Sequence, residues 1–265
     1  MTTSDLIPDL ANPDHARLEQ PDGHSIAYRL LKGRGPTVVF LGGFRSDMTG
    51  TKATALADWA AANGRAFVRF DWFGHGLSSG SFADGTIGRW RDDALAVLDK
   101  LTSGPVILVG SSMGGWIATL VARARRDRLA GLVTVAAAPD FTELLIWGSL
   151  NAAEQAALQR SGVHLAPSAH EPGPTPFTWR LVEEGRRHLL LGGPVDVDVP
   201  VRLHHGLADA EVPFGLSMDL AERLASRDVV LTLVKGGDHR LSTPADIARL
   251  LHDVAALADA AHPAP

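Results

Sequence analysis

The sequence contains no cysteine, which excludes disulfide bonds, cysteine-based zinc sites and thiol catalysis. It has no basic stripe either: lysines and arginines are scattered and the formal net charge is −5, so nucleic acid is not an expected partner. No apolar run approaches the roughly 18 residues that span a bilayer. The polar segment 1–23 shows no basic stretch followed by an apolar one, as a signal peptide would. We therefore expect a cytoplasmic protein without a membrane span.

The 265 residues have an ordinary globular composition, and apolar runs alternate with helical patterns along most of the chain. Strands are predicted at Ser25–Leu30, Thr37–Leu41, Ala66–Phe70, Val106–Val109, Leu129–Val135, Val199–His204 and Val229–Val234. Helices are predicted at Lys52–Asn63, Thr86–Leu101, Met113–Ala124, Phe214–Ala225 and Ala245–Ala260. This alternation predicts an α/β fold with a parallel sheet covered by helices on both faces.

About sixty residues between Pro139 and Pro200 interrupt this alternation. Helical patterns at Phe141–Gln159 and Phe177–Leu191 flank a stretch rich in proline and glycine, Val163–Pro176. The segment is too long for a simple connection, and open α/β sheets bind ligands outside the carboxyl ends of their strands. We predict a core of residues 1–139 and 197–265, and a cap of residues 140–196. The alternative is a pair of ordinary packing helices.

The strongest chemical signal is the pentapeptide Gly110-Ser111-Ser112-Met113-Gly114, between a predicted strand and a predicted helix. A tight strand–turn–helix of this kind exposes its central serine above the sheet, and small flanking residues make the turn possible. Ser112 is therefore the expected nucleophile, with Ser111 as its rival. The alternative is a plain Gly/Ser turn.

A serine hydroxyl needs a base, and the base needs an acid that orients it. Of the 11 histidines, His239 follows the last predicted strand, and its loop can reach over the sheet to Ser112. Asp209 follows the penultimate strand, thirty residues before His239, and is the expected acid. Four other histidines fit this role less well. His75 lies in a Gly-rich loop and is a candidate to line the site, at most one of His204 and His205 could approach it, and His252 is expected on the surface of a helix. Glu211 and Asp238 are the alternative acids.

The tetrahedral intermediate of acyl transfer needs an oxyanion hole. One expected donor is the backbone N–H of Met113, directly after the nucleophile. The other is the N–H of Phe44, which follows Gly42 and Gly43 in the loop after an early strand. Gly43 lets the backbone approach the substrate closely. No metal-ligand pattern, phosphate loop or dinucleotide fingerprint appears, so no cofactor is expected.

With these residues in place, the chain resembles the palmitoyl-protein thioesterases and acyl-glucuronide esterases of the α/β-hydrolase-domain group, whose animal members are mitochondrial. The pieces that carry the resemblance are Gly50-Thr51-Lys52-Ala53, Arg69-Phe70-Asp71, Gly88-Arg89-Trp90-Arg91, Val109–Trp116, His205–Pro213 and Asp238-His239-Arg240. It implies the α/β-hydrolase fold: a mostly parallel eight-stranded sheet flanked by helices, with a small helical cap. It also implies that Ser112, Asp209 and His239 form a catalytic triad.

The expected activity is hydrolysis of a carboxylic ester or thioester through an acyl-enzyme, on a small-molecule or acylated substrate, by a monomer or homodimer. Apolar cap residues either line an acyl pocket or simply pack the cap onto the sheet: Phe141, Leu144, Leu145, Trp147, Phe177 and Trp179. The alternatives are a small-substrate esterase or lactonase without thioester preference, and a non-catalytic ligand-binding protein on the same fold.

Overall fold

Eight strands form one sheet in the computed structural model, which describes residues 15–166 and 173–261. Their order across the sheet is β1-β2-β4-β3-β5-β6-β9-β10. Their bounds are β1 Ala16–Glu19, β2 Ser25–Leu31, β3 Arg34–Leu41, β4 Arg65–Phe70, β5 Val106–Ser111, β6 Leu129–Val135, β9 Val201–Gly206 and β10 Val229–Val234. Strand β2 runs antiparallel to β1 and β4, whereas all neighbours from β4 to β10 are parallel. The predicted mostly parallel eight-stranded sheet is confirmed.

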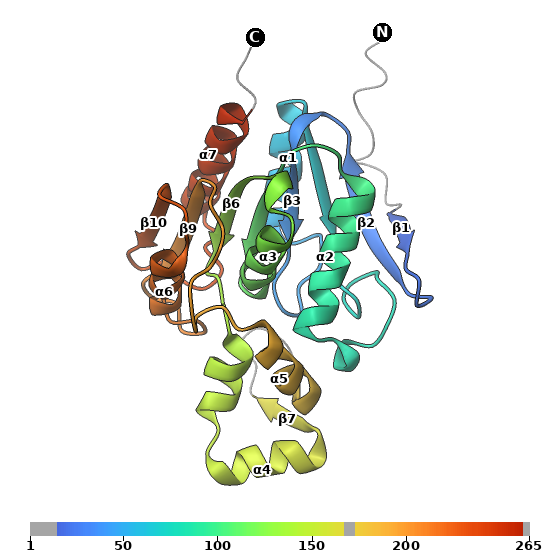
Figure 1. Ribbon diagram of the computed structural model, residues 1–265, viewed down its shortest axis with the longest axis vertical. Helices are drawn as coiled ribbons and strands as arrows, with labels where there is room; N and C mark the ends of the chain where they lie inside the picture. The colour runs from blue at the N-terminus through green and yellow to red at the C-terminus, as the bar shows by residue number, and fades with distance from the viewer. Residues whose placement is uncertain (1–14, 167–172, 262–265) are drawn as a thin grey trace.

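Helices cover both faces of this sheet (Figure 1). Helices α1 (Thr51–Ala62) and α7 (Pro244–Ala260) pack on one face, and α2 (Ile87–Leu101), α3 (Met113–Ala124) and α6 (Gly215–Arg223) on the other. All six residues of the central strand β5 are buried because helices cover it from both sides. This double burial explains why its sequence is continuously apolar up to the elbow glycine.

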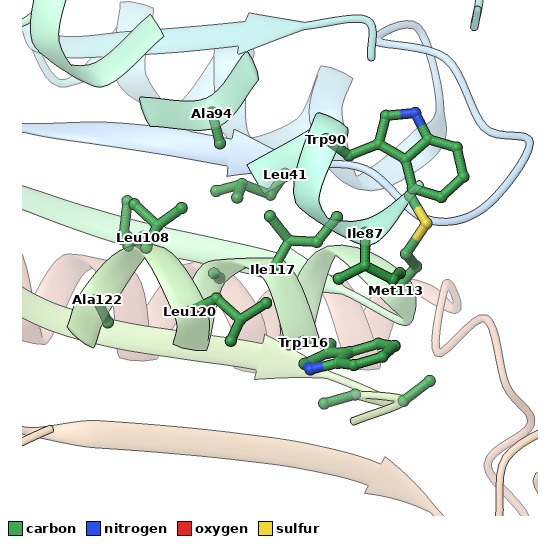
Figure 2. Packing of buried hydrophobic residues seen from close by; sticks show 14 of the residues in the cluster. Leu41, Ile87, Trp90, Ala94, Leu108, Met113, Trp116, Ile117, Leu120 and Ala122 are labelled. Carbon is green, nitrogen blue, oxygen red and sulfur yellow. The ribbon is translucent and has the colours of Figure 1, made fainter. Parts of the chain in front are cut away.

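Helix α3 is the most deeply buried helix beside the site, and ten of its twelve residues are buried. Figure 2 shows Trp116 and Ile117 of α3 among side chains of α2 and of the sheet, including Ile87 and Leu108. The Trp116 indole also donates a hydrogen bond to the backbone oxygen of His188, 3.0 Å away. Close packing of this kind resists displacement, so the residue at the start of α3 is held in a fixed place.

The edge strand β1 is absent from the sequence-based prediction. Its four residues pair with Ser25–Tyr28 of β2, yet three of them are exposed. An exposed edge strand buries too little apolar surface to leave an alternating pattern, so no signal marked it.

The chain between β6 and β9 folds beside the end of the sheet at which β6 terminates (Figure 1). It comprises a π-helical turn at Thr142–Ile146, a 3₁₀ turn at Trp147–Ser149, α4 (Ala152–Ser161), β7 (Val163–Ala166), β8 (Thr175–Thr178), α5 (Trp179–Gly185) and a 3₁₀ turn at Arg186–His188. The single helix expected over Phe141–Gln159 is therefore wrong. Asn151 starts a new helix there, because its side chain and that of Glu154 form a capping box.

The two halves of the expected loop Val163–Pro176 also differ from the prediction. Val163–Ala166 pairs antiparallel with Thr175–Thr178 as a two-stranded hairpin, and the rest of that loop includes residues outside the described part of the chain. The helix expected over Phe177–Leu191 begins only at Trp179, since Thr178 caps it by accepting a hydrogen bond from the N–H of Leu181.

Candidate active site

Ser112 lies on a strained turn between β5 and α3. Its φ of 54° and ψ of −120° are rare for a residue with a side chain. The Ser112 N–H donates to the backbone oxygen of Val135, 2.9 Å away, which ties the turn to β6. A Cβ on Gly110 would stand 2.3 Å from the oxygen of Gly114, and one on Gly114 would stand 2.1 Å from the oxygen of Leu41. Only glycine fits at either position, so the two glycines of the motif are sterically required.

The structure brings Ser112, His239 and Asp209 into one hydrogen-bonded line. Nδ1 of His239 lies 2.7 Å from Oδ2 of Asp209, and Nε2 lies 3.0 Å from Oγ of Ser112. Because the carboxylate can only accept, the proton of the neutral ring is on Nδ1, and Nε2 is free to accept from the Ser112 hydroxyl. The His239 side chain is 15% exposed and that of Asp209 is fully buried. Such a line can withdraw a proton from the serine hydroxyl.

Asp209 is held from both of its oxygens. Oδ1 accepts from the backbone N–H groups of Glu211 (2.9 Å) and Val212 (2.8 Å). Oδ2 accepts from His205 Nε2 at 3.0 Å and from His239. Burial favours the neutral acid, but the hydrogen bonds from His205, His239 and the Val212 N–H outweigh it and hold the pKa of Asp209 well below its usual range. Asp209 is therefore a carboxylate over the whole physiological pH range.

The alternative acids take other roles. Asp238 Oδ1 accepts a hydrogen bond from the N–H of Leu241, 2.9 Å away, and the side chain of Glu211 lines the cavity beside Ser112. Of the three candidate acids, Asp209 is the one whose hydrogen bond to His239 is seen among the described residues. The alternative nucleophile Ser111 is buried, and the contact of His239 goes to Ser112 instead.

The turn Gly43–Ser46 lies beside the serine. A Cβ on Gly43 would stand 3.4 Å from Cβ of Ser112, and the Gly43 oxygen accepts hydrogen bonds from both the N–H and the hydroxyl of Ser46. Arg45 has a φ of 61°, which turns the chain sharply after Phe44. Gly43 therefore lies close to the nucleophile, and the next residue along the turn is Phe44, whose N–H was expected as the second oxyanion donor.

The buried side chain of His75 forms a hydrogen bond to that turn. Its Nδ1 lies 3.1 Å from the oxygen of Phe73, so Nδ1 carries the proton, and its Nε2 accepts from the N–H of Arg45 at 3.1 Å. Burial lowers the pKa of His75 to about 4, which keeps the ring neutral and able to accept. His75 is not among the described residues that line the cavity, where the sequence placed it, and it contacts the turn instead.

A cavity of about 600 Å³ opens beside Ser112 and His239, within the range of small-molecule sites. Gly43 and Phe44 form part of its wall, and so do Thr175 and Phe177 from the hairpin. The described residues that line it also include charged side chains, namely Arg45, Asp47, Lys52, Glu211 and Arg240. Burial, with Arg240 close by, lowers the pKa of Lys52 to about 8. The cavity wall therefore combines apolar surface with charged side chains, whereas one of the two sequence-based expectations was an acyl pocket lined by apolar cap residues.

Three of the aromatic residues expected to bind substrate are not among the described residues that line this cavity. Trp147 and Trp179 pack on each other with ring centroids 5.1 Å apart, and the Arg186 guanidinium lies over both rings. Phe141 is buried between Trp116 and Phe44, with its ring edge-on to each. These side chains hold the segment together and onto the core. Phe177, which stacks on Phe44 at 5.5 Å, does reach the cavity.

In the part of the chain that the structure describes, no helix is both long enough and apolar enough to cross a membrane.

The fold and the linked serine, histidine and aspartate define the class: a serine hydrolase with the α/β-hydrolase fold. The family model described as serine aminopeptidase, S33, matches residues 35–186, which is more than half of the chain. The chain belongs to this family of α/β hydrolases.

Two solved structures and a curated protein that are similar to the chain agree with that assignment. A putative hydrolase from Agrobacterium vitis is 43% identical, with a TM-score of 0.88 over 92% of this chain and 98% of that chain. The α/β hydrolase domain-containing protein 10 from mouse is 36% identical, with a TM-score of 0.86 over the same shares. The human palmitoyl-protein thioesterase ABHD10, mitochondrial, is 39% identical over 91% of this chain and 79% of that protein.

Proposed function

We propose that the protein hydrolyses carboxylic ester or thioester bonds of acylated substrates, with Ser112 as nucleophile, His239 as general base and acid, and Asp209 as the carboxylate that orients His239. The observation that carries this proposal is the hydrogen-bonded line from Asp209 through His239 to Ser112 at the mouth of a cavity. The thioester part of the proposal is supported by the palmitoyl-protein thioesterase relatives.

In the first step, Ser112 Oγ forms a bond to the carbonyl carbon while its proton moves to His239 Nε2. The carbonyl oxygen becomes an oxyanion, and the proposed donors that stabilise it are the N–H groups of Met113, at the start of α3, and Phe44. The C–S or C–O bond then breaks, and the leaving group takes the proton from Nε2. Asp209 stabilises the imidazolium that exists between these two transfers.

In the second step, water replaces the leaving group. It loses a proton to Nε2 of His239 as it attacks the acyl carbon on Ser112, and the same donors stabilise the second oxyanion. The carboxylic acid is released when the Ser112 oxygen takes the proton back. Both steps use one base that accepts and donates in turn, so the ionised state of Asp209 matters to both.

We infer that residues 140–196 form a cap that selects the acyl donor, over a core of residues 1–139 and 197–265. Support comes from Thr175 and Phe177 of the hairpin, which reach the cavity wall within that segment. The polar wall formed by Lys52 and Arg240 favours a substrate with polar or charged groups near the scissile bond.

Activity on matched substrates tests the proposal. Purified protein should hydrolyse p-nitrophenyl butyrate and an S-butyryl thioester, and a fluorophosphonate probe should label it. Ser112→Ala should abolish both hydrolysis and labelling. Labelling or hydrolysis that survives in Ser112→Ala would overturn the assignment of the nucleophile.

The main alternative is a small-substrate esterase or lactonase without thioester preference. Comparing kcat/KM for p-nitrophenyl esters of rising chain length with kcat/KM for thioesters of the same acyl groups separates the two. A thioester advantage at equal chain length supports the thioesterase, and its absence supports the alternative. A non-catalytic binding protein on the same fold would give no labelling at all.

The cytoplasmic location stays a prediction from the sequence, whereas the names of the curated relatives include the word mitochondrial. Immunofluorescence of the protein against organelle markers would distinguish a cytoplasmic from a mitochondrial location. The expected monomer or homodimer likewise stays a prediction that light scattering would test.

A further inference from the structure

His205, the penultimate residue of β9, is a fully buried histidine that the proposed reaction does not use. Its Nε2 lies 3.0 Å from Oδ2 of Asp209 and also 3.0 Å from the backbone oxygen of Val212. Its Nδ1 lies 2.7 Å from Oγ of Ser217 in α6, which is itself fully buried. Both ring nitrogens are therefore occupied, and the ring is fixed from two elements, α6 and the loop after β9.

The partners determine which nitrogen carries the proton. A carboxylate and a carbonyl oxygen can only accept, so Nε2 of His205 is protonated and donates to both. In the neutral ring Nδ1 then accepts from the hydroxyl of Ser217. His205 is thus a fixed N–H donor aimed at the same oxygen of Asp209 that receives the N–H of His239.

This shared oxygen has a geometric consequence. The backbone N–H groups of Glu211 and Val212 hold Oδ1 of Asp209, and His205 holds Oδ2 independently of His239. A rotation or tilt of the carboxylate that moved Oδ2 away from His239 would therefore also break its contact with His205. We propose that His205 is a positioning residue that holds Oδ2 of Asp209 in line with His239 Nδ1. The proposal rests on the catalytic triad of the proposed function.

His204, the preceding residue of β9, provides a matched control. It is also buried, and its Nε2 lies 3.0 Å from an aspartate oxygen, Oδ2 of Asp253 in α7. Successive residues of a strand point to opposite faces of the sheet, so His204 faces α7 while His205 faces α6 and Asp209. Phenylalanine at either position removes a histidine–aspartate contact, but only His205 touches the proposed catalytic acid.

The experiment compares His205→Phe, His205→Gln, His205→Asn and His204→Phe on p-nitrophenyl butyrate. Each rate is divided by the concentration of sites that a fluorophosphonate labels, which removes differences in folding yield. The amide nitrogen of glutamine reaches the position of imidazole Nε2, whereas that of asparagine reaches only the position of Nδ1. We expect kcat per labelled site to fall about 10- to 100-fold in His205→Phe and His205→Asn, as for outer partners that orient a histidine. KM should stay within about twofold, because no group that touches substrate changes.

His205→Gln should recover most of the lost kcat, and His204→Phe should match the wild type per labelled site. If His205→Phe gives no labelled protein, the difference in kcat between His205→Asn and His205→Gln tests the positioning role. Wild-type kcat per site in His205→Asn, or a loss in His205→Gln equal to that in His205→Asn, would overturn the proposal. Failure of the proposed function is distinguishable, because then Asp209→Asn would itself retain wild-type kcat.

Discussion

Two regions of the site are built in different ways: its floor, which carries Ser112, Asp209 and His239, and the overlying segment between β6 and β9. On the floor, Ser112, Asp209 and His239 each directly follow a sheet strand or lie in the short loop after one, and hydrogen bonds join them into one line. Over it, the chain between β6 and β9 consists of one-turn helices, a hairpin of two four-residue strands and two short α-helices. It is held by two tryptophan rings in contact, Trp147 and Trp179, and by Arg186, whose guanidinium lies over both.

The difference separates two tasks. Chemistry needs atoms fixed to within fractions of an ångström, and strands that helices cover on both faces supply that rigidity. Substrate selection needs a wall that can differ without disturbing the floor, and short elements on a surface allow such variation. If this division holds, substitutions on the floor should lower kcat strongly, and substitutions in the overlying segment should change KM modestly.

The largest effect is expected at the nucleophile. Ser112→Ala removes the oxygen that forms the acyl-enzyme and should lower kcat on p-nitrophenyl butyrate about a millionfold, to the residual catalysis of the remaining site. Steady-state kinetics on protein whose melting temperature matches the wild type checks this. A loss of less than about a hundredfold would mean that another group carries the reaction.

The next largest effect is expected at the acid. Asp209→Asn replaces an acceptor with an amide that can donate to His239, which favours the wrong tautomer, and should lower kcat about 10⁴-fold. The fold should survive, as circular dichroism can show. Glu211→Gln serves as the control, because Glu211 lines the cavity whereas the described hydrogen bond to His239 is made by Asp209, and the variant should retain kcat within about threefold.

A smaller effect is expected on stability from His75, which supports the turn beside Ser112. The folded-state pKa of His75 is lowered to about 4, below the unfolded value of about 6.5. Between these values the unfolded chain binds a proton that the folded chain does not, so stability falls as pH is lowered from about 6.5 to about 4. This difference corresponds to about 3 kcal/mol.

Urea unfolding of wild type and His75→Gln at pH 7 and pH 4.5 isolates that contribution. Glutamine does not titrate, so the variant should lose about 2–3 kcal/mol less than the wild type between the two pH values. Burial raises the pKa of Asp93 to about 6, so Asp93 titrates in the same window with the opposite sign, but it cancels in the comparison. Equal losses in both proteins would show that His75 is not buried as a neutral ring.

The smallest effects are expected in the overlying segment, where two neighbouring aromatics form a matched pair. Phe177 lines the cavity and Trp179 packs away from it on Trp147. Phe177→Ala should raise KM for p-nitrophenyl octanoate about tenfold, which is the effect of losing roughly 1.4 kcal/mol of apolar contact. Trp179→Ala should change KM less than about threefold. If Trp179→Ala raised KM more than Phe177→Ala did, the acyl chain would bind against the tryptophans instead.

The floor of the site was predictable from the sequence because short local motifs and strand patterns mark it. Gly110 and Gly114 have no space for a side chain, and β5, β6 and β10 are bounded by sharp turns, so the pattern and the structure agree within two residues. The positions of Asp209 and His239 follow from strand order alone, since the carboxyl ends of parallel strands share one edge of the sheet.

The overlying segment was harder to predict for physical reasons. Its hairpin is held by backbone pairing between two four-residue strands, which leaves little side-chain pattern. The break at Asn151 depends on a capping box inside an otherwise helical composition. The role of His205 was also missed: nothing in the sequence says which of two adjacent histidines faces Asp209 until the register of β9 is known.

In the proposed reaction, an acyl group passes through Ser112. Mass spectrometry of the Asp209→Asn variant, quenched in acid during turnover of p-nitrophenyl butyrate, can detect that acyl group. Because p-nitrophenolate leaves without needing a proton, the variant should slow deacylation more than acylation, and the intermediate should accumulate. We expect one butyryl group per chain, in the peptide that contains Ser112, and none in the double variant Asp209→Asn, Ser112→Ala. A butyryl group on any other residue would contradict it.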